Sequence, residues 1–182
     1  MNLLFLRYGE TDWNAQRLIQ GRTDIPLNET GRGQAREQAA ALRNHQPPVD
    51  IIYASPLKRA SETAQIIQCA LNVPLRYDDR LMEQCFGNLE GTRISHRMAA
   101  AELARHGAEP FPEFYERVCD CLDMLDAAHA GQTVLVVAHG RVASMVHWYY
   151  HGHDDTDAAL HKNAVLRHYP KKCAGHRPPF VV

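Results

Sequence analysis

Residues Thr133-Val134-Leu135-Val136-Val137-Ala138 form the strongest β-strand signal in the chain, because apolar and β-branched residues follow one another without a polar break. A continuous apolar run of this length is typical of a strand that is buried on both faces of a sheet. Directly after it, Val142, Val146 and Tyr149 recur at helical spacing. The pattern therefore predicts a buried strand that passes into a helix at His139-Gly140.

Two further apolar runs predict strands of the same sheet. Leu3 to Leu6 ends in a polar, turn-rich segment and should be a central strand. Asp50 to Ala54 follows a helix expected over Gln34 to Arg43, with capping candidates at its head in Asn28-Glu29-Thr30-Gly31. Ser55-Pro56 offers an N-cap residue and a proline at the first helical position, which predicts a helix from there to about Leu71. Strands that alternate with helices indicate an α/β fold of three layers, with a mostly parallel sheet between helices.

The remaining segments are less regular. Residues 73–91 contain strand-like and turn-like pieces without a clean period, and Ile94 to Asp126 predicts two helices separated near Gly107 to Pro112. Ala164 to Tyr169 predicts a last strand. Because no internal repeat or linker interrupts the pattern, we expect a single domain over residues 1–182.

Composition excludes several classes of protein. A formal net charge of -1 over 182 residues argues against a broad nucleic-acid-binding surface, although it permits a small basic pocket. No apolar stretch approaches the length needed to cross a bilayer, and the first residues do not form a signal peptide. An odd number of scattered cysteines argues against a secreted disulfide framework, so we expect a reduced, cytoplasmic setting. The cysteines are Cys69, Cys85, Cys119, Cys121 and Cys173.

Cationic side chains follow three of the predicted strands. Arg7 ends the first strand, Arg59 lies one helical turn after the second, and His139 stands at the start of the helix after the third. Ligands of parallel sheets bind outside the carboxyl ends of the strands, where these groups should meet if the strands are neighbours. Arginine forks and a helix N-terminus suit a phosphoryl group, and Glu83 is a candidate acid for a leaving oxygen. No Walker-type glycine loop is present in the sequence.

Four motifs in order resemble those of the histidine phosphatase superfamily, whose members are phosphoglycerate-mutase-like. They are Leu6-Arg7-Tyr8-Gly9-Glu10-Thr11 with Gln20-Gly21, Ser55-Pro56-Leu57-Lys58-Arg59-Ala60, Leu81-Met82-Glu83-Gln84-Cys85-Phe86-Gly87, and Val136-Val137-Ala138-His139-Gly140. The resemblance runs over nearly the whole chain. It implies a phosphoglycerate-mutase-like α/β/α fold and a two-step transfer of a phosphoryl group through a histidine, without a metal or cofactor.

The resemblance also implies roles for individual residues. Arg7, Asn14, Arg59 and His139 would hold the phosphoryl group, and Glu83 would donate a proton. Substrate contacts are implied for Gln20, Gly21 and Gly140. Glu90 competes with Glu83 for the acid role on the residues alone, and Asn14 by itself is also typical of a turn cap. The chain is shorter than the glycolytic mutases, so it looks more like a phosphatase acting on a small phosphorylated metabolite than like a mutase-type phosphotransferase.

Tyr8 departs from the pattern, because it stands where the superfamily has its nucleophilic histidine. A phenol lacks the imidazole nitrogen, and a phosphotyrosine ester is stable where phosphohistidine is labile. Turnover by the usual route should therefore be impaired. Three interpretations stay open: a disabled phosphatase, which we favour; a non-catalytic protein that binds phosphorylated ligands or a partner protein; or a modified mechanism that uses His139 or an activated water.

Two other groups of residues have simpler explanations. His147, His151, His153 and Asp154 invite a metal-site hypothesis, since histidines four apart share a helical face. No glutamate of the metalloprotease pattern accompanies them, and histidine is common at helix C-termini, so we expect no metal. Cys119 and Cys121 lie two apart on one predicted helix and are expected to be packing residues.

Overall fold

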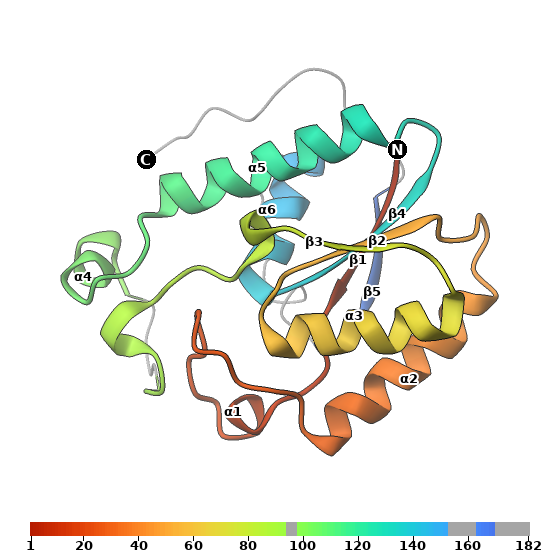
Figure 1. Ribbon diagram of the computed structural model, residues 1–182. Helices are drawn as coiled ribbons and strands as arrows, with labels where there is room; N and C mark the ends of the chain where they lie inside the picture. The colour runs from red at the N-terminus through yellow and green to blue at the C-terminus, as the bar shows by residue number, and fades with distance from the viewer. Residues whose placement is uncertain (94–97, 153–162, 170–182) are drawn as a thin grey trace.

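A mixed five-stranded sheet forms the centre of the protein in the computed structural model, which describes residues 1–93, 98–152 and 163–169 (Figure 1). The strand order is β3-β2-β4-β1-β5. Four strands run parallel, and β5 pairs antiparallel with β1. The strands are β1 (Asn2–Arg7), β2 (Ile51–Ala54), β3 (Leu75–Tyr77), β4 (Thr133–Ala138) and β5 (Leu166–Tyr169). The predicted three-layer α/β fold with a mostly parallel sheet is confirmed.

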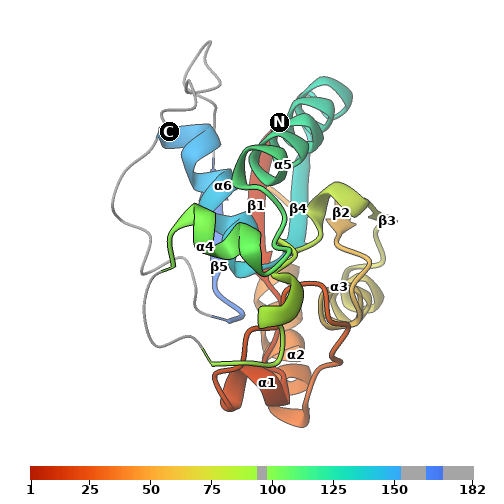
Figure 2. The same cartoon turned by 90° about the vertical axis from the view of Figure 1, so that its left-hand side faces the viewer.

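Helices cover both faces of this sheet (Figures 1 and 2). The helices are α1 (Asp12–Ala15), α2 (Glu29–Arg43), α3 (Lys58–Leu71), η1 (Asp79–Leu81), η2 (Gly87–Leu89), α4 (Ala100–Arg105), α5 (Phe111–Ala128) and α6 (Gly140–His151). Alternate residues of β1 face opposite layers: Leu3 and Phe5 pack with α5 and α6, whereas Leu4 and Leu6 pack with α2 and α3. Both faces of the sheet are therefore buried, which explains the continuous apolar runs.

The register of the sheet brings three strand ends to one edge. Arg7 of β1 pairs with Ala138 of β4, and Ala54 of β2 pairs with Val137 of β4. Since the three strands are parallel neighbours, the residues that follow them leave the sheet side by side. The sequence-based condition for a shared site, adjacent strands, is therefore met.

Two boundaries differ from the sequence-based prediction. Helix α2 begins at Glu29 rather than near Gln34, because the Asn28 side chain accepts a hydrogen bond from the Gly31 amide and caps the first turn. Helix α3 begins at Lys58, so Ser55 is not its N-cap residue. Strand β1 lies inside the sheet as expected, but β4 is the central strand.

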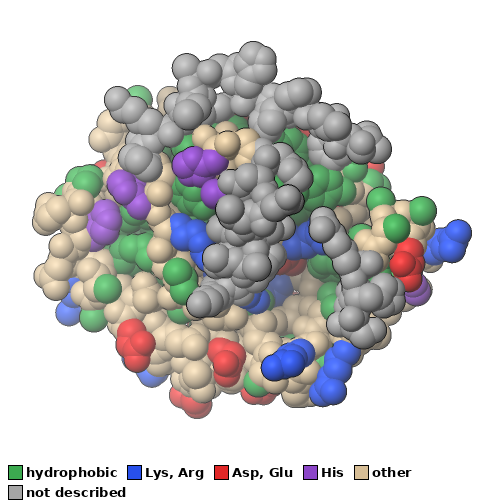
Figure 3. Space-filling model, turned by 180° about the vertical axis from the view of Figure 1, so that it is seen from behind, with side chains coloured by type: hydrophobic (Ala, Val, Ile, Leu, Met, Phe, Trp, Pro, Cys, Tyr) green, Lys and Arg blue, Asp and Glu red, His purple; other side chains and the backbone are tan. Residues whose placement is uncertain are grey.

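Cys119 and Cys121 are fully buried in the core between the sheet and α5, which confirms them as packing residues. In the described part of the chain, no helix combines the length and apolar character that a membrane span needs. Acidic and basic side chains are interspersed over the described part of the face in Figure 3, in keeping with the net charge of -1.

Candidate functional site

A pocket of about 160 Å³ opens beside the carboxyl ends of β1 and β2. It brings together seven of the nine predicted site residues. Its lining consists of Arg7, Tyr8, Asn14, Leu18, Ile19, Gln20, Gly21, Arg59, Glu83 and Phe86. His139 and Gly140 are not part of this lining.

Tyr8 lies at the centre of the cationic groups. Its side chain is 3% exposed, and its hydroxyl oxygen accepts hydrogen bonds from Arg7 Nη2 at 3.3 Å and from Gln20 Nε2 at 3.2 Å. The guanidinium carbons of Arg7 and Arg59 lie 5.1 and 5.0 Å from the centre of the phenol ring. One arginine and one amide therefore converge on the Tyr8 hydroxyl oxygen, and a second arginine lies at the ring of the same side chain.

Arg59 is fully buried although it carries a permanent charge. Its two terminal nitrogens donate to main-chain oxygens, Nη1 to Thr23 at 2.8 Å and Nη2 to Gly21 at 2.6 Å. These bonds fix the segment that carries Gln20 and Gly21 against the first turn of α3. Arg59 thus shapes the wall of the pocket as well as adding positive charge.

Three buried polar atoms of the pocket residues have no hydrogen-bond partner among the described residues: Arg7 Nε, Arg59 Nε and Gln20 Oε1. A buried polar group without a partner costs about 1–3 kcal/mol, so such atoms are uncommon in a folded protein. Their concentration around one small pocket indicates a binding site for a polar ligand, and two of the three are donors on cationic groups. The ligand chemistry that fits is that of an oxyanion.

His139 is fully buried at the N-cap position of α6. Its Nε2 lies 2.7 Å from Ser55 Oγ, and its ring centre is 5.2 Å from that of Tyr8. Burial, followed by the positive charges of Arg59 and Arg7, holds the pKa of His139 well below its ordinary value. The imidazole is therefore neutral at neutral pH, and it packs behind the phenol rather than lining the pocket.

Glu83 and Glu90 lie on the same loop but in different settings. Glu83 is 9% exposed and lines the pocket, and its carboxylate accepts from the amides of Gln84 at 3.0 Å and Arg141 at 3.2 Å. Glu90 accepts four hydrogen bonds, from the amides of Arg22, Thr23 and Phe86 and from the Thr23 hydroxyl. Burial alone would raise the pKa of Glu90, but these bonds outweigh it and lower that pKa.

Asn14 caps a helix at the edge of the pocket. Together with Thr11 it forms the capping box of α1, and it also lines the pocket. Asn163 donates to Asn14 Oδ1 at 3.3 Å and to the main-chain oxygen of Tyr8 at 3.1 Å. The sequence did not identify the contacts of Asn163 with Tyr8 and Asn14, nor the hydrogen bond between Ser55 and His139. Each of these contacts joins residues that are far apart along the chain.

The histidine group of α6 gives no support for a metal site. His147 and His151 have ring centres 4.9 Å apart, while His153 and Asp154 lie outside the described residues. Within the described ranges, no group of three or more histidine, cysteine, aspartate or glutamate side chains has the arrangement of a metal site.

Comparison with known proteins relates this chain to a family. Residues 3–168 match the histidine phosphatase superfamily (branch 1). The uncharacterized phosphatase PhoE of Bacillus subtilis (strain 168) is 40% identical over 136 residues, covering 74% of this chain and 69% of the relative. A metal-independent phosphoserine phosphatase of Arabidopsis thaliana is 32% identical over 160 residues, covering 80% of this chain and 66% of the relative. The solved structure of Bacillus stearothermophilus YhfR has 31% sequence identity and a TM-score of 0.73, with 81% of this chain and 78% of that chain covered. On its sequence and its fold, the chain belongs to the histidine phosphatase superfamily, branch 1.

Proposed function

We propose that the protein is a phosphomonoesterase for a small phosphorylated metabolite, with turnover that is impaired or altered by Tyr8. The observation that carries this proposal is the convergence of Arg7 and Gln20 on the Tyr8 hydroxyl, with Arg59 at the same ring. An oxygen held by these donors resembles one oxygen of a bound phosphoryl group. The names of the two curated relatives, a phosphatase and a phosphoserine phosphatase, support the same class of substrate.

The phosphoryl group would be held by charge and by oriented donors. Arg7 lines the pocket and can donate several hydrogen bonds from its guanidinium group. Arg59 adds a permanent positive charge, and its Nε has no hydrogen-bond partner in the described part of the chain. Asn14, Gln20 and Gly21 would complete the contacts on one side. His139 and the first amides of α6, including that of Gly140, would face the group once the ring at position 8 is smaller.

Glu83 is the proposed proton donor for the leaving oxygen. It lines the pocket, and each of its carboxylate oxygens is held by a main-chain amide, so its direction is fixed. Glu90 is unsuited to this role, because its lowered pKa and four accepted hydrogen bonds keep it ionised and occupied.

Tyr8 stands at the position that we assign to the nucleophile. Its hydroxyl already receives the donors of Arg7 and Gln20, and its ring covers His139. A phosphoryl group would have to displace the phenol, and a phosphotyrosine formed there would be a stable ester. We therefore expect slow release of phosphate by the native protein.

The test is a phosphatase assay of the native protein and of Tyr8→His with an aryl phosphate and a panel of phosphorylated metabolites. We expect slow turnover by the native protein and a large increase with Tyr8→His. A further change of Arg7→Ala or His139→Ala should then lower the rate by about 100-fold or more, as expected for loss of a group that stabilises the transferred phosphoryl. If Tyr8→His is inert toward every substrate, the site is not a disabled phosphatase.

A second candidate is a non-catalytic protein that binds phosphorylated ligands. It is favoured by the same internal hydrogen bonds of Tyr8, which occupy donors that catalysis needs. In that case inorganic phosphate or phosphorylated metabolites should raise the melting temperature of the native protein without being hydrolysed. No thermal shift in millimolar phosphate would count against this candidate.

A further inference from the structure

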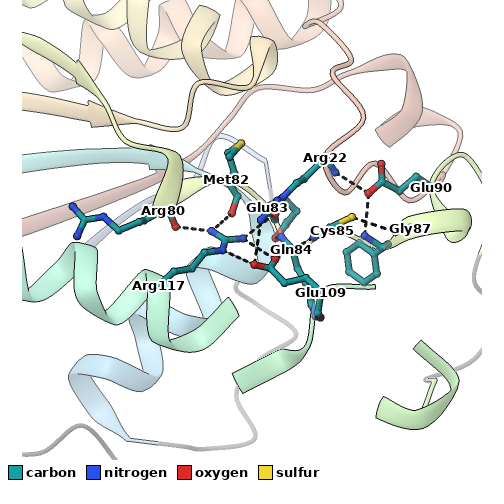
Figure 4. A network of polar contacts seen from close by, with 11 residues as sticks. Arg22, Arg80, Met82, Glu83, Gln84, Cys85, Gly87, Glu90, Glu109 and Arg117 are labelled. Atoms are coloured by element: carbon teal, nitrogen blue, oxygen red, sulfur yellow. Dashed lines mark hydrogen bonds and ion pairs between the residues drawn. The ribbon is translucent and has the colours of Figure 1, made fainter. Parts of the chain in front are cut away.

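The main chain of the loop that carries Glu83 is held by a single arginine of α5. Arg117 Nη1 donates to the carbonyl oxygens of Arg80 at 2.6 Å and Met82 at 2.8 Å, and its Nη2 donates to that of Glu83 at 3.1 Å (Figure 4). Three carbonyls within four residues thus point at one guanidinium. Met82 and Glu83 lie between η1 and η2, outside the regular elements, so no sheet or helix ladder fixes their carbonyls and these bonds hold the path of the loop.

Glu109 holds Arg117 in place and joins the loop a second time. Its carboxylate accepts from Arg117 Nε at 2.7 Å and Nη2 at 2.9 Å, the paired geometry that is strongest for an arginine and a carboxylate. The same carboxylate accepts from the Cys85 amide at 3.3 Å and from Arg22 Nη2 at 3.1 Å. Arg22 adds a weak contact, 3.4 Å from its Nε to the Glu83 carbonyl oxygen.

The pair is well shielded from water. The side chain of Arg117 is 17% exposed and that of Glu109 is 11% exposed. Burial alone would raise the pKa of Glu109, but the hydrogen bonds and charge of Arg117 outweigh it, so that pKa is lowered. An ion pair with this geometry and burial holds its position more firmly than an exposed one, whose contribution is small.

We propose that Arg117, held by Glu109, is the positioning residue that aims the Glu83 carboxyl group at the leaving oxygen of the substrate. This inference rests on the proposed function. During the transfer in Tyr8→His, an imidazole nitrogen at position 8 forms a bond to phosphorus with its own electron pair, while the bond from phosphorus to the ester oxygen breaks with its electron pair on that oxygen. The proton of the Glu83 carboxyl group passes to the same oxygen, and Glu83 is left as a carboxylate.

Lysine cannot replace Arg117 in this arrangement. The planar guanidinium makes five hydrogen bonds, to three carbonyls and to both oxygens of Glu109. An ammonium group has three donors at one point and cannot reach the same set. Arg117→Lys therefore preserves the charge and loosens the loop, which separates positioning from electrostatics.

The test compares leaving groups in the Tyr8→His background. A p-nitrophenolate leaves without a proton, whereas the alkoxide of phosphoserine or glycerol 3-phosphate needs one. We expect Arg117→Lys to lower kcat/KM for the alkyl phosphates about tenfold or more, which is part of the roughly 10²–10⁴-fold that a general acid supplies. The value of kcat/KM for the aryl phosphate should change less than about twofold. Glu83→Gln should show the same selectivity to a greater extent, and Glu109→Gln should resemble Arg117→Lys.

Arg32→Lys is the matched control. Arg32 also binds two carboxylates, Glu29 at 2.5 Å and Glu62 at 2.6 Å, but on α2 and α3 and not on the Glu83 loop. Arg32→Lys should leave kcat/KM unchanged for both classes of substrate. If Arg117→Lys lowers kcat/KM equally for alkyl and aryl phosphates, or lowers it for neither, the inference is overturned.

Amide hydrogen exchange gives a readout that does not depend on activity. Arg117→Lys should speed exchange in the peptide that covers residues 80–86 and leave the peptide of β4 protected, whereas Arg32→Lys should change neither. If Tyr8→His is inactive, the proposed function fails, and this exchange measurement alone decides whether Arg117 fixes the loop. Unchanged exchange at residues 80–86 would show that it does not.

Discussion

Gly21 is the position where the shape of the pocket depends most directly on a missing side chain. Its φ of +50° is in the left-handed region, and a Cβ atom added there would lie 2.1 Å from Glu90 Oε1. In Gly21→Ala the left-handed conformation alone costs about 1–2 kcal/mol. The Glu90 carboxylate must also move away from the amides of Arg22 and Phe86, and each lost bond to a charged group is worth about 1.5–3 kcal/mol. Because such losses are not additive, we expect a total of at least about 3 kcal/mol.

Two other glycines separate these contributions. Gly131 has a φ of +80° and no atom within 4 Å of an added Cβ, so Gly131→Ala should cost only the conformational part, about 1–2 kcal/mol. Gly33 lies in α2 with equally open space, and Gly33→Ala should stabilise the protein by about 0.5–1 kcal/mol. Urea denaturation at pH 7 measures all three. If Gly21→Ala costs no more than Gly131→Ala, Glu90 does not hold the pocket loop in the way described.

Three further predictions concern buried groups. His139 is neutral in the folded state, while an unfolded histidine takes up a proton near pH 6.5, so stability should fall as the pH drops below about 6.5, by up to roughly 1.4 kcal/mol per pH unit. His139→Asn should remove that part of the slope in urea denaturation between pH 7.5 and 5, and an unchanged slope would contradict a buried neutral imidazole. Ser55→Ala removes the partner of His139 Nε2 and should cost about 1–3 kcal/mol, whereas a loss below 0.5 kcal/mol, roughly the smallest value for a hydrogen bond, would show that the contact is unimportant. Iodoacetamide at pH 8 should modify exposed Cys69 and spare Cys121, because burial raises the pKa of that thiol to about 12; peptide mass spectrometry showing equal labelling would disprove this.

The sequence predicted the sheet well, because its strands are buried on both faces. Continuous apolar runs such as Leu3 to Leu6 and Thr133 to Ala138 are typical of strands covered on both faces. The end of each run therefore indicated which residues lie at the carboxyl end of its strand. The sequence offered capping candidates at Asn28 to Gly31, and Asn28 is the cap, but the helix itself was drawn only from Gln34 because Thr30, Gly31 and Gly33 are poor helix formers.

The sequence identified residues of the site but not the contacts among them. Arg7, Arg59 and Glu83 were identified and do line one pocket, but the sequence contains no signal that Tyr8 covers His139 or that Arg59 donates to main-chain oxygens. Those facts follow from tertiary packing of side chains. The contact of Arg117 with the Glu83 loop joins residues 34 positions apart through a main-chain oxygen, which no side-chain pattern in a sequence records.

A crystal structure of Tyr8→His with orthovanadate, which mimics a phosphoryl group, would show whether this pocket holds that group. We predict a single vanadate in the pocket, with oxygens about 3 Å from the Arg7 guanidinium and Gln20 Nε2 and with the introduced imidazole beside the vanadium. Vanadate bound elsewhere, with the pocket side chains of Arg7 and Gln20 unchanged and in contact only with each other, would contradict the account.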